Sequence, residues 1–120
     1  MSLQTLILCR RAPYGSALAR EGLEAALASA AMDQIPDLLF SGDGIFQLLD
    51  NQAPEEIQQK SLLRNLQALP LFGVERIHIC QQSLNRRGIG VDAIALPGLE
   101  LTLVEDTGAL IARYQHVLSF

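Results

Sequence analysis

Short apolar runs rich in β-forming residues alternate with segments of helical periodicity along this chain. Strands that alternate with helices in this way are typically parallel and covered by helices on both faces of their sheet. The order therefore predicts an α/β fold, a three-layer α/β/α domain around a central, mainly parallel, five-stranded sheet. The expected strands are Leu3–Cys9, Asp37–Ser41, Val74–Ile79, Leu99–Val104 and Val117–Phe120.

Five helices are expected between and around these strands. Ser16 and Asp106 can serve as N-cap residues of the first and the last helix, because their side chains accept backbone N–H bonds. Gly22 in mid-helix costs about 1 kcal/mol relative to alanine, which indicates a close approach to the sheet or to a partner chain. Pro70 is expected to end the third helix. The expected helices are Ala17 to about Met32, Ile45–Leu49, about Glu55–Leu69, Gln81–Arg87 and Thr107–Tyr114.

Leu99–Val104 alternates between apolar and mostly polar residues, which predicts a half-exposed strand at an edge of the sheet. The length of 120 residues suits one core and is too short for two ordinary domains. No linker interrupts the chain, so residues 1–120 are expected to form a single domain.

The charge balance argues against direct binding to nucleic acid. Thirteen acidic and nine basic residues give a net charge of -4, and the basic residues are scattered. Apolar residues make up 49% of the chain and Lys60 is its only lysine, so some apolar surface is expected to meet another subunit.

Neither a signal peptide nor a membrane span is expected. The apolar run Leu3–Cys9 is short and is followed by Arg10 and Arg11, the reverse of a signal peptide's order. No apolar run approaches the roughly 20 residues that a membrane span needs. The two cysteines form no Cys-x-x-Cys pair, so neither a disulfide framework nor a zinc site is indicated. The expected location is the cytoplasm, with reduced thiols.

Cys80 is the main chemical candidate, because it lies where a strand passes directly into a helix. Unpaired N–H groups and the helix dipole at such a position favour thiolate over thiol. The alternative is a small buried hydrophobic side chain that closes the strand. Ligands bind at the carboxyl ends of parallel strands, so Cys9 with Arg10, Ser41–Gly44 and Cys80–Ser83 are expected to share one edge.

The remaining candidates have simpler interpretations. The Ser41–Gly44 turn lacks both the dinucleotide and the phosphate-loop pattern, so its glycines are expected to permit a turn while Asp43 caps the next helix. His78 and His116 lack metal-ligand spacing and are interpreted as structural or exposed. Arg86 and Arg87 are expected to compensate the helix dipole at the far end of the Cys80 helix.

Five strings of the sequence resemble the DsrE/F/H family, and within it the TusC/DsrF group of sulfur-relay C subunits. The likeness runs nearly end to end. The strings are Pro13–Gly15, Arg20–Ala25, Asp43–Leu49, Ile79–Cys80 with Ser83–Leu84 and Arg87–Gly88, and Val117–Phe120.

The resemblance implies a DsrE/F-like subunit of a hetero-oligomeric complex with TusB-like and TusD-like partners, arranged as a dimer of trimers. Such a complex passes persulfide sulfur between carrier proteins toward 2-thiolation of the tRNA wobble uridine, without a metal or organic cofactor. Sulfur oxidation is the other endpoint that the sequence leaves open. In this family the D subunit bears the acceptor cysteine before a helix that ends in Arg-Arg-Gly, and Cys80 followed by Arg86-Arg87-Gly88 fits that position.

Three functions therefore remain open. In the first, the chain is mainly a structural, non-catalytic partner of the sulfur-accepting D subunit. In the second, Cys80 itself accepts sulfur as a persulfide, which makes the chain a sulfurtransferase component. In the third, the chain is a homo-oligomeric α/β domain that binds a small ligand at Gly42–Gly44.

Overall fold

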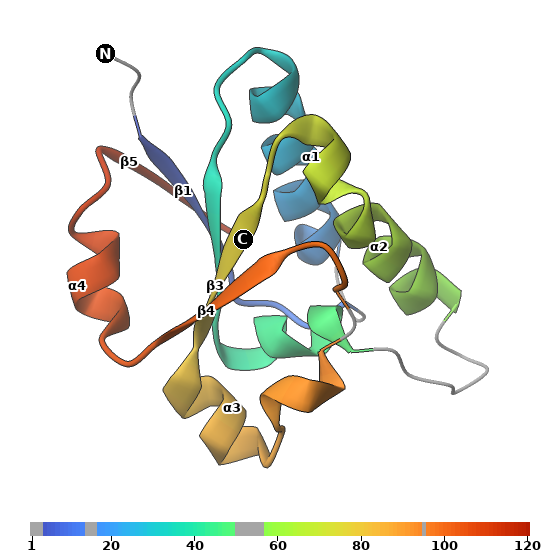
Figure 1. Cartoon of the computed structure of the whole chain (residues 1–120), viewed down its shortest axis with the longest axis vertical. Coiled ribbons are helices and arrows are strands. Elements are labelled where there is room, and N and C mark those ends of the chain that lie inside the picture. The colour runs from blue at the N-terminus through green and yellow to red at the C-terminus, as the bar shows by residue number, and fades with distance from the viewer. Residues whose placement is uncertain (1–3, 14–16, 50–56, 95) are drawn as a thin grey trace.

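A five-stranded, entirely parallel sheet with the strand order β4-β3-β2-β1-β5 runs through the centre of the molecule (Figure 1). The computed structural model describes residues 4–13, 17–49, 57–94 and 96–120, and the side chains of residues 57–61 lie outside the description. The predicted α/β fold is confirmed, and β4 lies at an edge as its alternating pattern predicted. The strands are β1 Thr5–Cys9, β2 Asp37–Phe40, β3 Arg76–Cys80, β4 Glu100–Val104 and β5 His116–Ser119.

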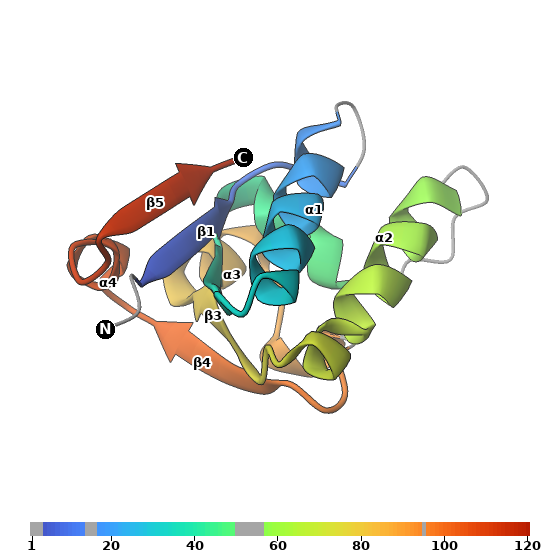
Figure 2. The ribbon, with the colours of Figure 1, turned by 90° about the horizontal axis from the view of Figure 1, so that it is seen from above.

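Helices cover the two faces of the sheet unequally. Figure 2 shows α1 and α2 along one face and the short α4 on the other, while α3 lies beyond the carboxyl ends of the strands in Figure 1. The α-helices are α1 Leu18–Ala31, α2 Ile57–Gln67, α3 Gln81–Arg87 and α4 Thr107–Ile111. The 3-10 helices are η1 Gly42–Leu48, η3 Leu69–Phe72 and η4 Val91–Ala93.

The packing of apolar side chains follows this asymmetry. The large cluster between the sheet and α1 and α2 includes Ile7, Phe40 and Ile79, each fully buried. A much smaller cluster under α4 is centred on Leu6, Leu39 and Leu110. Because burial of one such side chain stabilises a fold by roughly 1.5–3 kcal/mol, most of the hydrophobic stabilisation comes from the α1 and α2 side.

Several element ends differ from the prediction. The helix expected at Ile45–Leu49 is a 3-10 helix that begins at Gly42, and α4 ends at Ile111 instead of Tyr114. Tyr114 is held by a hydrogen bond from its hydroxyl to Asp37 Oδ2 (2.5 Å), which draws the chain out of the helix. The strand after Pro36 stops at Phe40, and β3 extends through Cys80.

The end of α2 is also earlier than predicted. The helix ends at Gln67, and Pro70 lies inside the separate 3-10 helix Leu69–Phe72. Proline has no N–H to donate to the carbonyl four residues before it, so the α-helical bonding cannot continue through Pro70, which lies at the start of the new element. The predicted start near Glu55 lies outside the described residues.

The two predicted N-caps have different outcomes. Asp106 caps α4, because its Oδ1 accepts a hydrogen bond from the Ala109 N–H at 3.0 Å. The predicted cap Ser16 lies outside the described residues, and Ala17 is the N-cap residue of α1.

Two glycines allow close approaches. A Cβ atom on Gly22 would lie 3.2 Å from Cβ of Phe120, so the close approach predicted in mid-helix is made to the residue that follows β5. At Gly44 a Cβ atom would lie 2.0 Å from the carbonyl oxygen of Cys9, which is backbone and cannot turn aside. Gly44 is therefore required by the distance between two backbone segments.

Gly44→Ala is expected to destabilise the fold by about 3 kcal/mol or more, because the added methyl group forces the η1 turn away from β1. Urea unfolding followed by circular dichroism measures this change. Gly90→Ala is the matched control, since nothing lies within 4 Å of a Cβ there, and it is expected to stay within about 0.5 kcal/mol of the wild type. Equal stability of the two variants would contradict the assigned contact.

Candidate functional site

The last residues of β1, β2 and β3 lie together where the parallel strands end, as predicted. We call this end of the sheet its carboxyl edge, and the end where the strands begin its amino edge. The Ser41 N–H donates to the carbonyl of Cys9 at 3.1 Å, and the Gly42 N–H donates to Ser83 Oγ at 2.8 Å. The Arg10 N–H donates to the carbonyl of Phe120 at 2.9 Å. Backbone and side-chain bonds thus join four segments that are distant in the sequence.

Cys80 lies where the sequence predicted, as the last residue of β3 and the N-cap residue of the seven-residue helix α3. It is 7% exposed and forms no disulfide. Its register partner in β4 is Val104, which packs in the small cluster under α4. The thiol is therefore held inside the isolated chain, in agreement with the buried alternative.

Cys9 ends β1 and packs in the large core, with 3% of its surface exposed. Loss of solvation by burial raises the pKa of its thiol to about 12. A thiol with that pKa stays protonated near neutral pH and is a poor nucleophile. Cys9 is thus unsuited to accept sulfur.

Arg87 connects α3 to η1. Its Nη2 lies 2.8 Å from Oδ1 of Asp43, and its Nη1 donates to the carbonyl of Ser83 at 3.2 Å. The guanidinium also lies 6.0 Å from the ring centroid of Phe46. The prediction that Arg87 only compensates its own helix dipole is therefore incomplete, because the side chain reaches back across the edge of the sheet.

The prediction that Asp43 caps the following helix is wrong. Asp43 lies inside η1, whose N-cap residue is Ser41, and its carboxylate pairs with Arg87. Only Gly42 of the two turn glycines has a positive φ, at 55°. Arg86 is exposed, as a charge at a helix end is expected to be.

Gln47 is a buried polar residue that the sequence analysis missed. It is 1% exposed, and its Nε2 donates to the carbonyl of Arg11 at 2.8 Å. An amide inside the otherwise apolar run Ile45–Leu49 was the available signal. The bond fixes η1 to the segment that follows β1.

His78 and Tyr114 form the polar part of the α4 face. His78 is 9% exposed and its Nδ1 has no hydrogen-bond partner in the structure. Burial lowers the pKa of His78, and the neighbouring carboxylate of Asp37 opposes this in part. Burial and the hydrogen bond to Asp37 raise the pKa of Tyr114. Each histidine was expected to be structural or exposed. His78 is buried and structural, and His116 is exposed.

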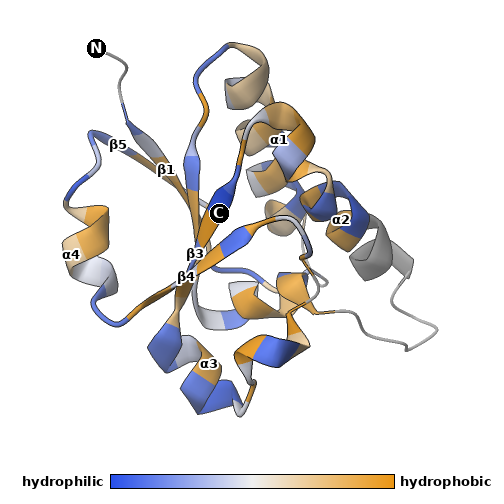
Figure 3. Cartoon of the chain, in the orientation of Figure 1, coloured by the Kyte–Doolittle hydropathy of each residue, from blue (hydrophilic) through white to orange (hydrophobic). Residues whose placement is uncertain are grey.

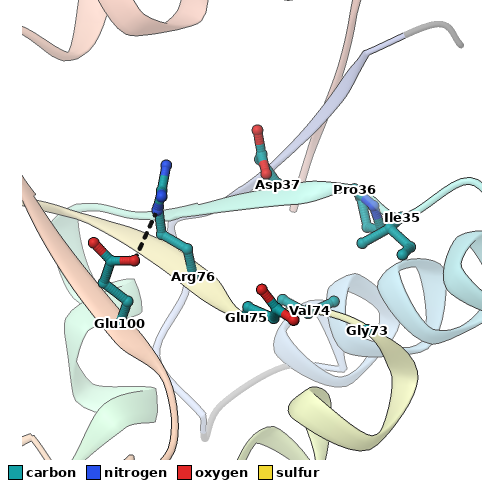
Figure 4. Close-up of a pocket in the computed structure, with 8 residues that line it drawn as sticks. All are labelled: Ile35, Pro36, Asp37, Gly73, Val74, Glu75, Arg76 and Glu100. Carbon is teal, nitrogen blue, oxygen red and sulfur yellow. Dashed lines mark hydrogen bonds and ion pairs between the residues drawn. The ribbon is translucent and has the colours of Figure 1, made fainter.

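A cavity of about 220 Å³ lies at the opposite, amino edge of the sheet (Figure 4). It contains neither cysteine. Among the side chains that the structure describes, no group of three or more His, Cys, Asp and Glu residues could hold a metal ion. The lining residues are Ile35, Pro36, Asp37, Gly73, Val74, Glu75, Arg76 and Glu100.

Residues 4–120 match the DsrE/DsrF-like family. The chain belongs to this family. This DsrE/DsrF-like chain is 40% identical over 119 residues to a protein of Pseudomonas aeruginosa named "Protein TusC homolog", and the match covers 99% of each chain.

The DsrE/DsrF-like fold is also seen in a solved structure, the ychN protein from E. coli. The TM-score is 0.73 at 22% identity, with 98% of this chain and 99% of the other covered, so the likeness supports the fold alone. Within the described ranges, every helix is too short or too polar to span a bilayer.

The DsrE/DsrF-like fold is expected to lose stability as the pH falls below the ordinary histidine pKa of 6.5, because buried His78 binds its proton less readily when folded than when unfolded. Above that pH His78 is neutral in both the folded and the unfolded chain, so this loss of stability is absent. Urea unfolding at a series of pH values between roughly 7 and 5 measures the loss.

His78→Gln is expected to flatten this part of the pH profile. His116→Gln is the control, since that histidine is exposed, and it is expected to keep the wild-type profile. If His78→Gln leaves the slope unchanged, another group causes the pH dependence.

Proposed function

We propose that this DsrE/DsrF-like chain is the C-type subunit of a hetero-oligomeric sulfur-relay complex that passes persulfide sulfur toward 2-thiolation of the tRNA wobble uridine. The proposal rests on the 40% identity, over 99% of both chains, to the protein named as a TusC homolog. TusB-like and TusD-like subunits are the proposed partners, in a dimer of trimers in the cytoplasm. The chain's main contribution is structural.

The two thiols support a non-catalytic role. Cys80 is buried, and the raised pKa of Cys9 leaves almost no thiolate at neutral pH. Burial also lowers the pKa of His78, so the imidazole is neutral and supplies no positive charge to a thiolate. A persulfide acceptor needs an accessible, ionised sulfur, which suits the D-type partner better.

Exposed apolar side chains support assembly with other chains. They lie on both edge strands, on η3 and η4, and around the end of α1. Such residues lose contact with water when a subunit interface covers them. The exposed large apolar residues of the described chain are Met32, Ile35, Leu71, Phe72, Val91, Leu103, Val117 and Leu118.

The small-ligand alternative finds less support at Gly42–Gly44. The Gly42 N–H is bonded to Ser83, and the Asp43 carboxylate is paired with Arg87. Gly44 lies against the backbone of Cys9. These internal contacts occupy the groups that a ligand would use.

Co-expression with TusB-like and TusD-like proteins is expected to give one stable particle that contains all three chains. Size-exclusion chromatography with native mass spectrometry measures its composition. The chain expressed alone is the control for self-association. A homo-oligomer that ignores both partner types would contradict the proposed function.

The second candidate function, sulfur transfer through Cys80, is favoured by the position of this residue at the carboxyl edge, directly before α3. In such a step the Cys80 thiolate attacks the outer sulfur of a donor persulfide. The new S–S bond forms as the donor's S–S bond breaks, and the donor leaves as a thiolate. No net oxidation occurs.

Intact mass after incubation with a persulfide donor separates the two roles. The non-catalytic proposal predicts no added sulfur on the wild-type chain or on the assembled complex's C-type subunit, because the thiol is buried. Cys80→Ser and Cys9→Ser are the matched variants. An added sulfur atom that disappears in Cys80→Ser and persists in Cys9→Ser would make Cys80 a carrier.

A further inference from the structure

Four exposed apolar side chains gather beyond the amino edge of the sheet, where the end of α1 and η3 pack together. Their exposed fractions are 74% for Met32, 55% for Ile35, 86% for Leu71 and 44% for Phe72. We call these residues the amino-edge patch. Figure 3 shows the apolar colouring of both segments side by side. Single exposed apolar residues are ordinary, whereas a group of large ones usually marks a contact surface.

The fold directs these side chains outward. In the 3-10 helix η3, Leu69 is fully buried and anchors the turn, which leaves Leu71 and Phe72 toward solvent. Gly73 follows with a φ of 91°, and a Cβ atom there would lie 2.7 Å from Cδ1 of Ile35. Ile35 therefore packs directly on the turn, which brings the segment after α1 against the end of η3.

Ile35 of the amino-edge patch also lines the cavity at the amino edge, together with Gly73, which follows Phe72. The cavity therefore adjoins the patch. Three of its lining residues are acidic and one is basic. The basic residue, Arg76, pairs with Glu100 at 3.4 Å, and Asp37 accepts the hydroxyl hydrogen bond of Tyr114. The cavity thus has an acidic surplus beside an apolar surface.

Asp37 and Glu75 are the two acids of this surplus, and Glu75 is the one whose carboxylate is available to a partner. Among the side chains that the structure describes, none forms an ion pair or hydrogen bond with its carboxylate. In Figure 4, Glu75 lies beside Val74 and Gly73, whereas Asp37 and Arg76 project to the other side of the sheet. Glu75 and Ile35 line the same cavity, which links this acidic residue to the amino-edge patch.

We propose that the amino-edge patch and the adjoining cavity form a docking surface for a partner protein whose contacting segment carries arginine or lysine beside apolar side chains. The apolar groups cover the patch, and the cation pairs with Glu75. Such charge complementarity directs a partner to one site. A guanidinium is the better match, because its planar fork can bind a carboxylate with two hydrogen bonds.

The charges argue against a second copy of this chain as the occupant. A two-fold contact through the same patch places Glu75 near the partner copy's acidic cavity, with like charges at an apolar interface. The net charge of -4 adds to the repulsion. A basic partner meets neither obstacle.

Two short peptides test the proposal on the purified chain, acetyl-Leu-Arg-Leu-amide and acetyl-Leu-Glu-Leu-amide. Titration followed by two-dimensional ¹H–¹⁵N NMR is expected to shift the amide signals of Ile35, Gly73 and Val74 with the arginine peptide. Added salt is expected to weaken this binding. Glu75→Gln is expected to weaken it on the order of threefold, the range for an exposed ion pair.

Glu105→Gln is the matched control and is expected to bind like the wild type. Glu105 is an exposed acid that follows the carboxyl end of β4, away from the amino-edge patch. Equal binding of the glutamate peptide, or no shift at these amides, would overturn the proposal. Self-association that Leu71→Ser abolishes would instead assign the patch to a second copy. Neither peptide is a relay component, so these results are independent of the proposed sulfur-relay function.

Discussion

The contact between Gly44 and the carbonyl of Cys9 determines the arrangement of the whole carboxyl edge. With a side chain excluded at Gly44, η1 lies directly against the end of β1. That position brings the Gly42 N–H to Ser83 and the Asp43 carboxylate to Arg87. Helix α3 is therefore oriented by a turn that comes from another part of the chain. Cys80, the N-cap residue of α3, lies at the start of the helix that these contacts hold.

The two faces of the sheet differ in how strongly they are held. On one side, α1 and α2 share a large, fully buried core with the sheet. On the other, α4 has five residues and rests on a small cluster that includes Leu110. The Tyr114–Asp37 hydrogen bond and the buried His78 add polar groups to this thin layer. Local opening is easiest where few apolar contacts exist, so the α4 side is the face expected to open first.

Local patterns were enough to predict much of this fold. Alternating elements indicated a parallel sheet, the polar alternation of β4 indicated an edge, and Asp106 marked the start of α4. These signals work because each depends on a few neighbouring residues. The family was likewise indicated by short strings spread along the sequence.

The contacts within the site could not be predicted in the same way. Arg87 and Asp43 are separated by 44 positions, and Gln47 reaches the backbone of Arg11 across 36. Nothing local distinguishes these partners from other residues of the same type. The burial of Cys80 also depends on how β4 and α3 pack around it, so the sequence left both an exposed and a buried thiol open.

Pairing between β1 and β5 joins two strands that are far apart in the sequence, Thr5–Cys9 and His116–Ser119. During synthesis on the ribosome, β1 can bind β2 early, yet one of its edges stays unpaired until residues 116–119 have left the exit tunnel. Closure of such a long loop is slow, and an open strand edge is a template for aggregation. Pairing of β5 with β1 is therefore expected to come late in folding, and until then one edge of β1 is open to pairing with other chains.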